Sequence, residues 1–214
     1  MKKNIIAILS AALLLCMGAV SCDKFLDRPA EDTYNEANFY QNDSQCEQGV
    51  NYLYNSPWYD VIRGFYRVGE IYSGNYYMQG SAYQNFSVNG SDQDLTNMSS
   101  SLWAVNANCT TVYNRLQSAT CSEDTRSRLM GEVLTWKAFA YFFLVRSFGD
   151  VPIIHDIQAS IAEGGYNAIN KVQKADVYEY IVMTLEKAME LLPKKVANTD
   201  GRIDYYSAEA LLAK

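Results

Sequence analysis

The chain has 214 residues, with 24 acidic and 18 basic side chains and a formal net charge of −6 at pH 7. This length is ample for one hydrophobic core, and an acidic chain without a basic cluster argues against binding to nucleic acid or to anionic lipid headgroups. Tyrosine is frequent, at 17 residues, and its ring faces suit the binding of polar ligands, although most tyrosines in such a chain are ordinary half-buried side chains.

Residues 1–21 have the layout of an export signal. Lys2 and Lys3 precede an apolar stretch over residues 5–15, which is shorter than the ~20 apolar residues that a membrane-spanning helix needs. Small residues lead up to Cys22, which predicts cleavage before Cys22 and a lipid anchor on its thiol. More than one acyl chain there would anchor the chain stably to a membrane. The alternative is an ordinary secretory signal cleaved near Ser21, which would leave Cys22 unmodified.

Residues 22–34 are predicted to be an extended, lipidated tether, and residues 35–214 are predicted to be one helical region. Asp43 or Ser44 can cap a first helix, whose apolar residues recur at helical spacing. A second helical face follows Pro57.

Residues 74–101 break this pattern. They combine Gly, Ser, Asn, Gln and Asp with scattered aromatic residues and show no sustained period. A segment of this length without secondary structure, inside a compact domain, is usually functional or disordered. We therefore expect residues 74–101 to be a long loop that is either functional or disordered.

Residues 123–148 carry the strongest helix signal. Ser122 is a suitable N-cap, Gly149 can end the helix, and apolar residues cover almost the whole circumference, which indicates burial between other helices. A weaker helix is predicted over residues 103–116.

Two more helices are predicted toward the C-terminus. One begins at Asp176, where Asp176 and Glu179 match a capping box, and it ends at Pro193. The other begins with Ser207 as its N-cap, and the sequence stops after one or two turns without a partner for its apolar face. We therefore expect the chain to be the N-terminal part of a longer protein, incomplete at its C-terminus.

The cysteines allow little cross-linking. Cys46, Cys109 and Cys121 remain once Cys16 and Cys22 are set aside. They permit at most one intramolecular disulfide, for which Cys109 and Cys121 are the obvious pair in an oxidising compartment, and they do not form a disulfide framework.

No catalytic constellation is evident in the sequence. His155 is the one histidine, and no Ser, Cys or carboxylate motif accompanies it. Glu186 and Glu190 lie four residues apart, but the neighbouring Lys187 indicates a solvated helix face. A Gly-rich phosphate loop, zinc-ligand spacing and a calcium loop are also missing. We therefore predict no enzyme activity, no metal and no cofactor.

Several segments, in order along the chain, resemble the SusD-like (RagB/SusD) family of nutrient-uptake lipoproteins. The first is Cys22-Asp-Lys-Phe-Leu-Asp27, followed by Pro29. The most distinctive is Ala138-Phe-Ala-Tyr-Phe-Phe-Leu-Val-Arg-Ser-Phe-Gly-Asp-Val-Pro152, and residues 176–193 and 201–214 match the segments that follow it. One departure lies after Trp103, where the family usually has an apolar helix and this chain carries Asn106, Asn108, Thr110 and Thr111.

The resemblance implies an all-α fold of tetratricopeptide-like helix pairs with long loop excursions. The helix over residues 103–116 would pair with that over 123–148, and the helix over 176–192 with the one from Ser207. The residues by themselves support only paired amphipathic helices, because the apparent period of about 50 residues differs from the roughly 34 of a tetratricopeptide repeat.

The resemblance also implies a function. SusD-like proteins lie on the outer face of the outer membrane and bind oligosaccharides or, in some members, peptides. They act as a lid on a SusC-like TonB-dependent transporter and break no bond. The alternative class is a helical-repeat lipoprotein that assembles envelope complexes and has no small ligand, and glycoside hydrolysis is the third interpretation.

The long loop is the candidate binding site on this reading. A sugar ring has a face of C–H groups that stacks on an aromatic ring, and such sites are mostly apolar with a few placed polar groups. In the family this neighbourhood contributes to the ligand site, so we expect Tyr76, Tyr77 and Tyr83 to stack against an oligosaccharide. The competing interpretation for each tyrosine is that its ring only covers a helix end.

Overall fold

The computed structural model describes residues 39–55, 58–165, 169–195 and 199–214. The signal segment, Cys22 and the predicted tether lie outside these residues. The compact unit is Tyr40–Lys214, and its helices are α3 (Asp43–Asn51), the 3₁₀ turn η1 (Tyr52–Tyr54), α4 (Trp58–Tyr66), the π-helical turn η2 (Arg67–Ile71), α5 (Gln93–Gln117), α6 (Glu123–Phe148), α7 (Ile157–Ala162), α8 (Lys174–Leu191) and α9 (Tyr205–Leu212).

The fold is all-α, as predicted. Within the described ranges the only β-type pairing is a single bridge between Val151 and Val172. No helix among these residues combines the length and the apolar character needed to cross a bilayer.

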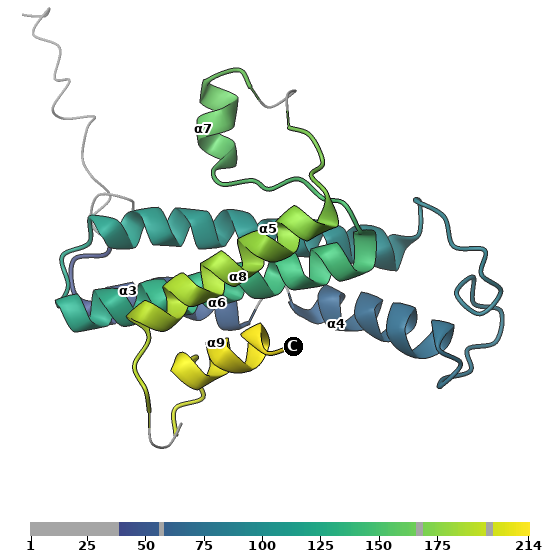
Figure 1. Cartoon of the computed structure of the whole chain (residues 1–214), viewed down its shortest axis with the longest axis horizontal. Helices are drawn as coiled ribbons and strands as arrows, with labels where there is room; N and C mark the ends of the chain where they lie inside the picture. Colours follow the sequence, from purple (N-terminus) through teal and green to yellow (C-terminus); the bar gives the residue numbers. More distant parts are fainter. Residues whose placement is uncertain (1–38, 56–57, 166–168, 196–198) are drawn as a thin grey trace, which may run out of the picture. The chain divides into compact units, whose positions relative to one another are not determined.

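Helix α6 is the centre of the compact unit, and α5, α8 and α3 pack on it (Figure 1). It begins where predicted, with the Ser122 hydroxyl accepting the Thr125 amide, and it ends at Gly149, whose φ of 72° suits a residue without a Cβ atom. Its buried positions occur on several sides of the helix, which explains why its apolar residues cover most of the circumference. The predicted pairs α5–α6 and α8–α9 are both formed.

Helix α5 is longer than predicted and begins at Gln93 instead of near residue 103. The Asp92 carboxylate caps it by accepting the backbone amides of Asp94 and Leu95, both at 3.1 Å. Its first turns are mostly polar, so the sequence shows no apolar periodicity there. Met98 is nevertheless fully buried and is part of the hydrophobic core. The loop therefore ends at Asp92, about ten residues earlier than predicted.

The caps of the last two helices also differ from the prediction. Helix α8 begins at Lys174, with Gln173 at its N-cap making no side-chain capping bond, so the capping box predicted at Asp176 is not formed. Helix α9 begins at Tyr205, and the capping box there joins Asp204 and Ser207. Ser207 is thus the third residue of the helix, and Asp204 is its N-cap.

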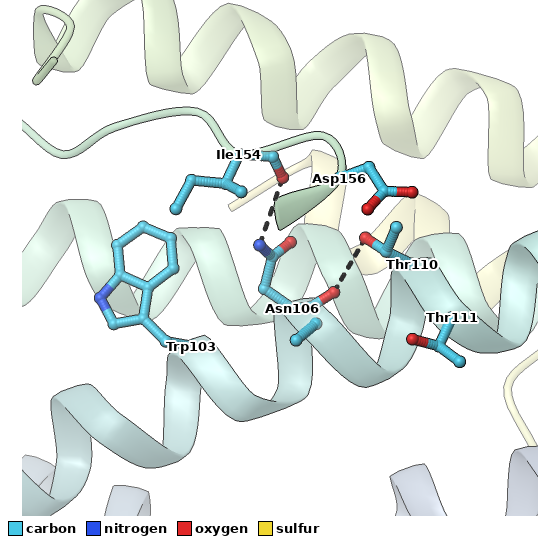
Figure 2. A pocket seen from close by; sticks show the side chains of 7 residues that line it. Trp103, Asn106, Thr110, Thr111, Ile154 and Asp156 are labelled. Atoms are coloured by element: carbon cyan, nitrogen blue, oxygen red, sulfur yellow. Dashed lines mark hydrogen bonds between the residues drawn. The ribbon is translucent and has the colours of Figure 1, made fainter. Parts of the chain in front are cut away.

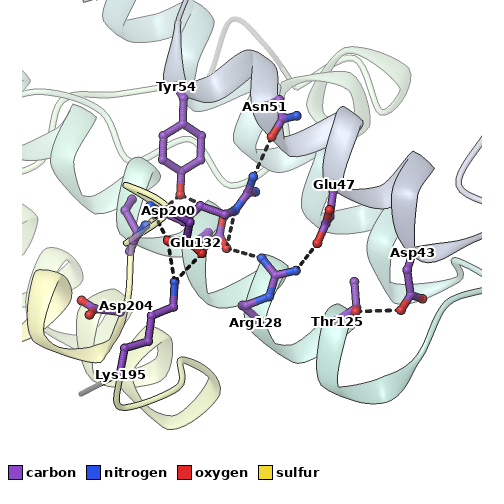
Figure 3. Close-up of polar contacts among 12 residues, drawn as sticks. Asp43, Glu47, Asn51, Tyr54, Thr125, Arg128, Glu132, Lys195, Asp200 and Asp204 are labelled. Carbon is purple, nitrogen blue, oxygen red and sulfur yellow. Dashed lines mark hydrogen bonds and ion pairs between the residues drawn. The ribbon is translucent and has the colours of Figure 1, made fainter. Parts of the chain in front are cut away.

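A buried carboxylate, Glu132 of α6, ties three parts of the chain together (Figure 3). It is 0% exposed and accepts hydrogen bonds from Arg128 Nη1 at 2.9 Å, Arg202 Nη2 at 2.7 Å and the Tyr54 hydroxyl at 2.8 Å. Arg128 also pairs with Glu47 of α3 at 2.5 Å. Because a buried charge is tolerated only when it is paired and hydrogen-bonded, this network fixes η1 and the segment before α9 against α6.

The cysteine pair suggested by the sequence is not the pair that the fold brings together. Cys109 is fully buried on α5, eight residues before the helix ends at Gln117, or about 12 Å along its axis. Cys121 lies beyond this end of α5, just before α6, whereas the Cα atoms of a disulfide are only roughly 4–7 Å apart. Cys121 instead lies beside Cys46: it precedes Ser122, which Asp43 of α3 binds, and it contributes to the raised pKa of Cys46.

Candidate functional site

The segment between η2 and α5, residues 72–92, forms what we call the aromatic loop. Figure 1 shows it projecting at the right-hand end of the view, beyond α4. It is held by its own hydrogen bonds, for example from the Ser87 amide to the Ala82 carbonyl at 2.9 Å and from the Met78 amide to Gln84 Oε1 at 3.2 Å. Its backbone therefore has a defined path without being a helix or a strand.

Two of the three predicted tyrosines present their rings to solvent. Tyr77 is 70% exposed and Tyr76 is 47% exposed. The Tyr76 amide donates to the Glu70 carbonyl at 3.1 Å, and its ring meets the Tyr66 ring edge-to-face with 5.3 Å between centroids. Tyr76 is thus positioned by α4 and η2, whereas Tyr77 projects freely.

The third tyrosine, Tyr83, is placed differently. It is 2% exposed, and its hydroxyl donates to Asp92 Oδ1 at 2.5 Å, the same oxygen that caps α5. Burial, followed by the hydrogen bond to Asp92, raises the pKa of Tyr83 above its ordinary value. The expectation that Tyr83 offers its ring to a ligand does not fit this burial, because the ring is enclosed and anchors the loop to the start of α5.

Two aromatic residues outside the predicted set complete the loop surface. Tyr72 and Phe86 stack nearly parallel, with 5.3 Å between centroids and 3° between planes. Phe86 is 75% exposed, and the buried Tyr83 ring supports Tyr72 at 5.6 Å. Phe86 was visible in the sequence as one more aromatic residue of the loop, but its pairing with Tyr72 depends on the folded path of the backbone.

The base of the loop is fastened by ion pairs. Asp94, in the first turn of α5, is almost fully buried and pairs with Arg63 Nε at 3.0 Å and with Arg67 Nη1. Arg63 belongs to α4 and Arg67 to η2. These pairs therefore hold both ends of the loop together.

An aromatic groove of about 470 Å³ lies beside α4 and α6. Tyr66 lines it and also touches Tyr76, so the groove and the aromatic loop meet at Tyr66. The Trp136 Nε1 group in this region is buried and has no hydrogen-bond partner among the described residues. The groove is lined by Tyr54, Trp58, Val61, Ile62, Phe65, Tyr66, Glu70, Trp136, Phe139 and Phe143.

Two of the four polar residues of α5 that depart from the family pattern, Asn106 and Thr110, bind the segment after α6 (Figure 2). Asn106 Nδ2 donates to the Ile154 carbonyl at 3.3 Å, and the Thr110 hydroxyl lies 2.9 Å from the His155 carbonyl. Lys137 of α6 donates to Thr110 Oγ1 at 2.8 Å, and burial lowers the pKa of this lysine. These residues fasten the segment after α6 across α5 and leave a cavity of about 260 Å³ beside Trp103.

The candidate catalytic groups do not converge. His155 is exposed, and its ring packs edge-to-face on Tyr180 at 5.5 Å. Glu190 is exposed and pairs with Lys187 at 2.7 Å, as expected of a solvated helix face. Within the part of the chain that the structure describes, no group of three or more His, Cys, Asp or Glu residues is arranged to hold a metal ion.

Comparisons with known proteins agree with the resemblance seen in the sequence. The SusD-like family model described as "Starch-binding associating with outer membrane" matches residues 24–214. A SusD-like protein from Bacteroides ovatus is 30% identical over 223 aligned residues, which cover 100% of this chain and 39% of that protein. The chain therefore spans about two fifths of the length of this relative.

Solved structures show the same fold. A structure with a xylogluco-oligosaccharide has a TM-score of 0.64 at 24% identity and covers 78% of this chain and 33% of its own. A laminarin-binding SusD-like protein has a TM-score of 0.64 at 22% identity and covers 81% of this chain and 39% of its own.

Proposed function

The chain belongs to the SusD-like family, and we propose that it captures oligosaccharides at the cell surface and passes them to a SusC-like TonB-dependent transporter. Capture requires binding and release, with no bond broken. The aromatic loop is the surface that makes the first contact with the glycan.

The observation that carries this proposal is the set of exposed rings on the aromatic loop. Tyr77 and Phe86 are largely exposed and Tyr76 is about half exposed, although burying an aromatic ring is favourable. Rings that stay in water on a hydrogen-bonded loop are available for the C–H faces of sugar rings. The buried Tyr83 keeps the loop in place and so reduces the entropy lost on binding.

Polar side chains on the same loop supply the second half of glycan recognition. Gln79 and Asn85 are exposed, and their amide groups can both donate to and accept from sugar hydroxyls. This mixture of ring faces and a few amides is typical of saccharide sites. Relatives of this fold with a xylogluco-oligosaccharide and with laminarin support a glycan as the ligand class.

The anchor and the tether belong to the same proposal. Lipid on Cys22 would hold the chain at the outer membrane, facing the cell exterior, and residues 22–34 would let the helical unit swing while it stays attached. A lid over a transporter needs this combination of freedom and attachment.

Isothermal titration of the purified chain tests the proposal, with xylogluco-oligosaccharides and laminari-oligosaccharides as probes. We expect at least one probe to bind and the Tyr76→Ala/Tyr77→Ala double variant to bind about tenfold more weakly, since one or two stacked rings contribute on the order of 1 kcal/mol. Tyr206→Ala is the matched control, because Tyr206 is also exposed but lies on α9. Equal binding by the double variant and the parent chain would show that these loop tyrosines do not bind the glycan.

A peptide ligand is the second candidate, and the aromatic groove favours it because an apolar peptide side chain can enter such a groove. Titration with an aromatic-rich peptide distinguishes the two ligands. If neither glycan nor peptide binds and the chain co-purifies with envelope-assembly proteins, these results support the alternative that the chain is an assembly lipoprotein. Co-purification with a SusC-like transporter supports delivery.

A further inference from the structure

The start of α3 and the turn between α5 and α6 are fastened together, although they are far apart in the sequence. The Asp43 carboxylate accepts the Ser122 amide and the Ser122 hydroxyl, both at 2.7 Å, and the Thr125 hydroxyl at 2.9 Å. The Thr120 amide donates to the Tyr40 carbonyl at 2.9 Å. Figure 3 shows Asp43 directed at Thr125.

Two cysteines lie directly beside this contact. Cys46 follows Asp43 by three residues on α3, so the two side chains share a helix face, and Cys121 immediately precedes Ser122. The two thiols lie close enough for Cys121 to raise the pKa of Cys46. Cys46 is fully buried, whereas Cys121 is partly exposed, and both are free thiols in the structure.

The surroundings of the pair decide the order in which the thiols can react. Burial, with a further contribution from Cys121, raises the pKa of Cys46 to about 12. A thiolate is the attacking species in thiol–disulfide exchange, so the buried Cys46 is a poor first nucleophile. Cys121, which reaches solvent, is the thiol that an external oxidant can meet.

We propose that Cys46 and Cys121 form a disulfide that joins α3 to the turn between α5 and α6 when the chain meets a disulfide oxidant. The Cys121 thiolate attacks one sulfur of the oxidant and releases the other sulfur as a thiol. Cys46 then loses its proton, attacks the Cys121 sulfur of the mixed disulfide and releases the second thiol. Two protein thiols are oxidised and one oxidant disulfide is reduced to two thiols.

The cross-link closes a loop of about 75 residues, which contains α4, the aromatic loop and α5. A disulfide over so long a loop stabilises the folded chain mainly by restricting the unfolded one. The Asp43 contacts bring the two ends together before the bond forms, so little rearrangement of the backbone is required. The part of the chain that carries the exposed rings would thereby be tied into the helix bundle.

The test uses the full chain with Cys16→Ser and Cys22→Ser, so that only the three described cysteines remain. The chain is incubated with oxidised glutathione, digested without reduction and analysed by mass spectrometry. We expect a peptide linking Cys46 to Cys121, an intact mass lower by about 2 Da, and a fall from about three titratable thiols to about one in denaturant. Reduction should lower the unfolding midpoint by roughly 5–10 °C.

Two variants make the test decisive. Cys109→Ser should keep the cross-link, while Cys121→Ser, at a partly exposed position that tolerates serine, should abolish both the linked peptide and the shift in midpoint. A linked peptide of Cys109 and Cys121, or glutathione adducts on Cys121 without closure to Cys46, would overturn the proposal. Neither result depends on which ligand the aromatic loop binds.

Discussion

The helix bundle buries much of its aromatic surface, although some of its rings, such as Tyr59 and Tyr206, are exposed, whereas the aromatic loop exposes most of its rings. In the bundle, Trp136 and Phe139 pack edge-to-face with 5.9 Å between ring centroids, and Tyr141 is fully buried. In the loop, Tyr77 and Phe86 face solvent. The contrast indicates that ring burial stabilises the bundle, while the loop keeps its rings available for contact with another molecule.

The two regions also differ in how they are held. The bundle is closed by the buried Glu132 network, which spans residues far apart in the sequence. The loop depends on the hydrogen bond from Tyr83 to Asp92 and on the ion pairs of Asp94 at its base. Substitutions in the bundle should therefore change stability, and substitutions of exposed loop rings should change binding.

The largest effect is expected for Glu132→Ala. Removing this carboxylate leaves Arg128, Arg202 and the Tyr54 hydroxyl without their shared acceptor inside the fold, and breaking a buried ion pair costs about 3–5 kcal/mol. Urea unfolding should show this loss of free energy. Glu190→Ala is the control, because Glu190 pairs with Lys187 on the surface. A loss no larger than the control's would mean that the network does not hold the bundle.

Gly131→Ala should destabilise the contact between α6 and α8. A Cβ atom there would lie 2.7 Å from Leu192 Cγ and 3.1 Å from the Ala188 carbonyl oxygen, and overpacking of this kind costs about 1–3 kcal/mol. Thermal unfolding measures the effect. Gly69→Ala has only Phe65 at 4.0 Å and should be neutral or slightly stabilising, so an equal loss for both variants would contradict the packing account.

Tyr83→Phe should weaken the loop more than the bundle. The ring remains, but the hydrogen bond to Asp92 is lost, at a cost of about 1 kcal/mol. Hydrogen exchange should speed up for amides of the loop while those of α6 stay protected. Tyr77→Phe is the matched control, because Tyr77 is on the same loop but is 70% exposed. Faster exchange throughout α6 would show that Tyr83 supports the bundle as well.

The smallest effect is expected at acid pH. Hydrogen bonds from Ser122 and Thr125 hold the pKa of Asp43 below its ordinary value. A carboxyl whose folded-state pKa is lowered adds stability above its unfolded pKa, and this stability is lost as the pH falls through the folded pKa. Asp43→Asn should therefore lose less stability than the parent chain as the pH falls below about 4, the ordinary pKa of an Asp carboxyl, where the loss sets in. Asp124→Asn, at an exposed position of α6, is the control and should lose stability like the parent chain. Thermal unfolding at each pH measures the stability of all three proteins.

The sequence predicts the bundle better than the loop, for reasons that particular residues show. The limits of α6 are legible because its cap, Ser122, and its apolar residues are local signals. The start of α5 is missed because its first turns are mostly polar, even though Asp92 is a good capping residue. The cap of α9 is assigned to Ser207 instead of Asp204, since both residue types cap helices and only the folded backbone separates them.

The candidate site residues also differ in how far the sequence predicts their placement. Exposure of Tyr76 and Tyr77 agrees with their place in a polar loop, whereas burial of Tyr83 follows from contacts with Asp92 and Tyr72 that no sequence period encodes. The closeness of Cys46 and Cys121 likewise depends on the long-range contacts of Asp43 with Ser122. Local patterns thus locate the loop, and the tertiary fold decides which of its rings are free.

Hydrogen–deuterium exchange with and without a laminari-oligosaccharide tests most directly whether the aromatic loop is the glycan surface. We expect added ligand to slow exchange at amides of residues 72–92, with little change in α6 and α8, because the rings of Tyr76, Tyr77 and Phe86 lie on that loop. Protection confined to the cavity beside Trp103, or to the helices while the loop exchanges as before, would contradict it.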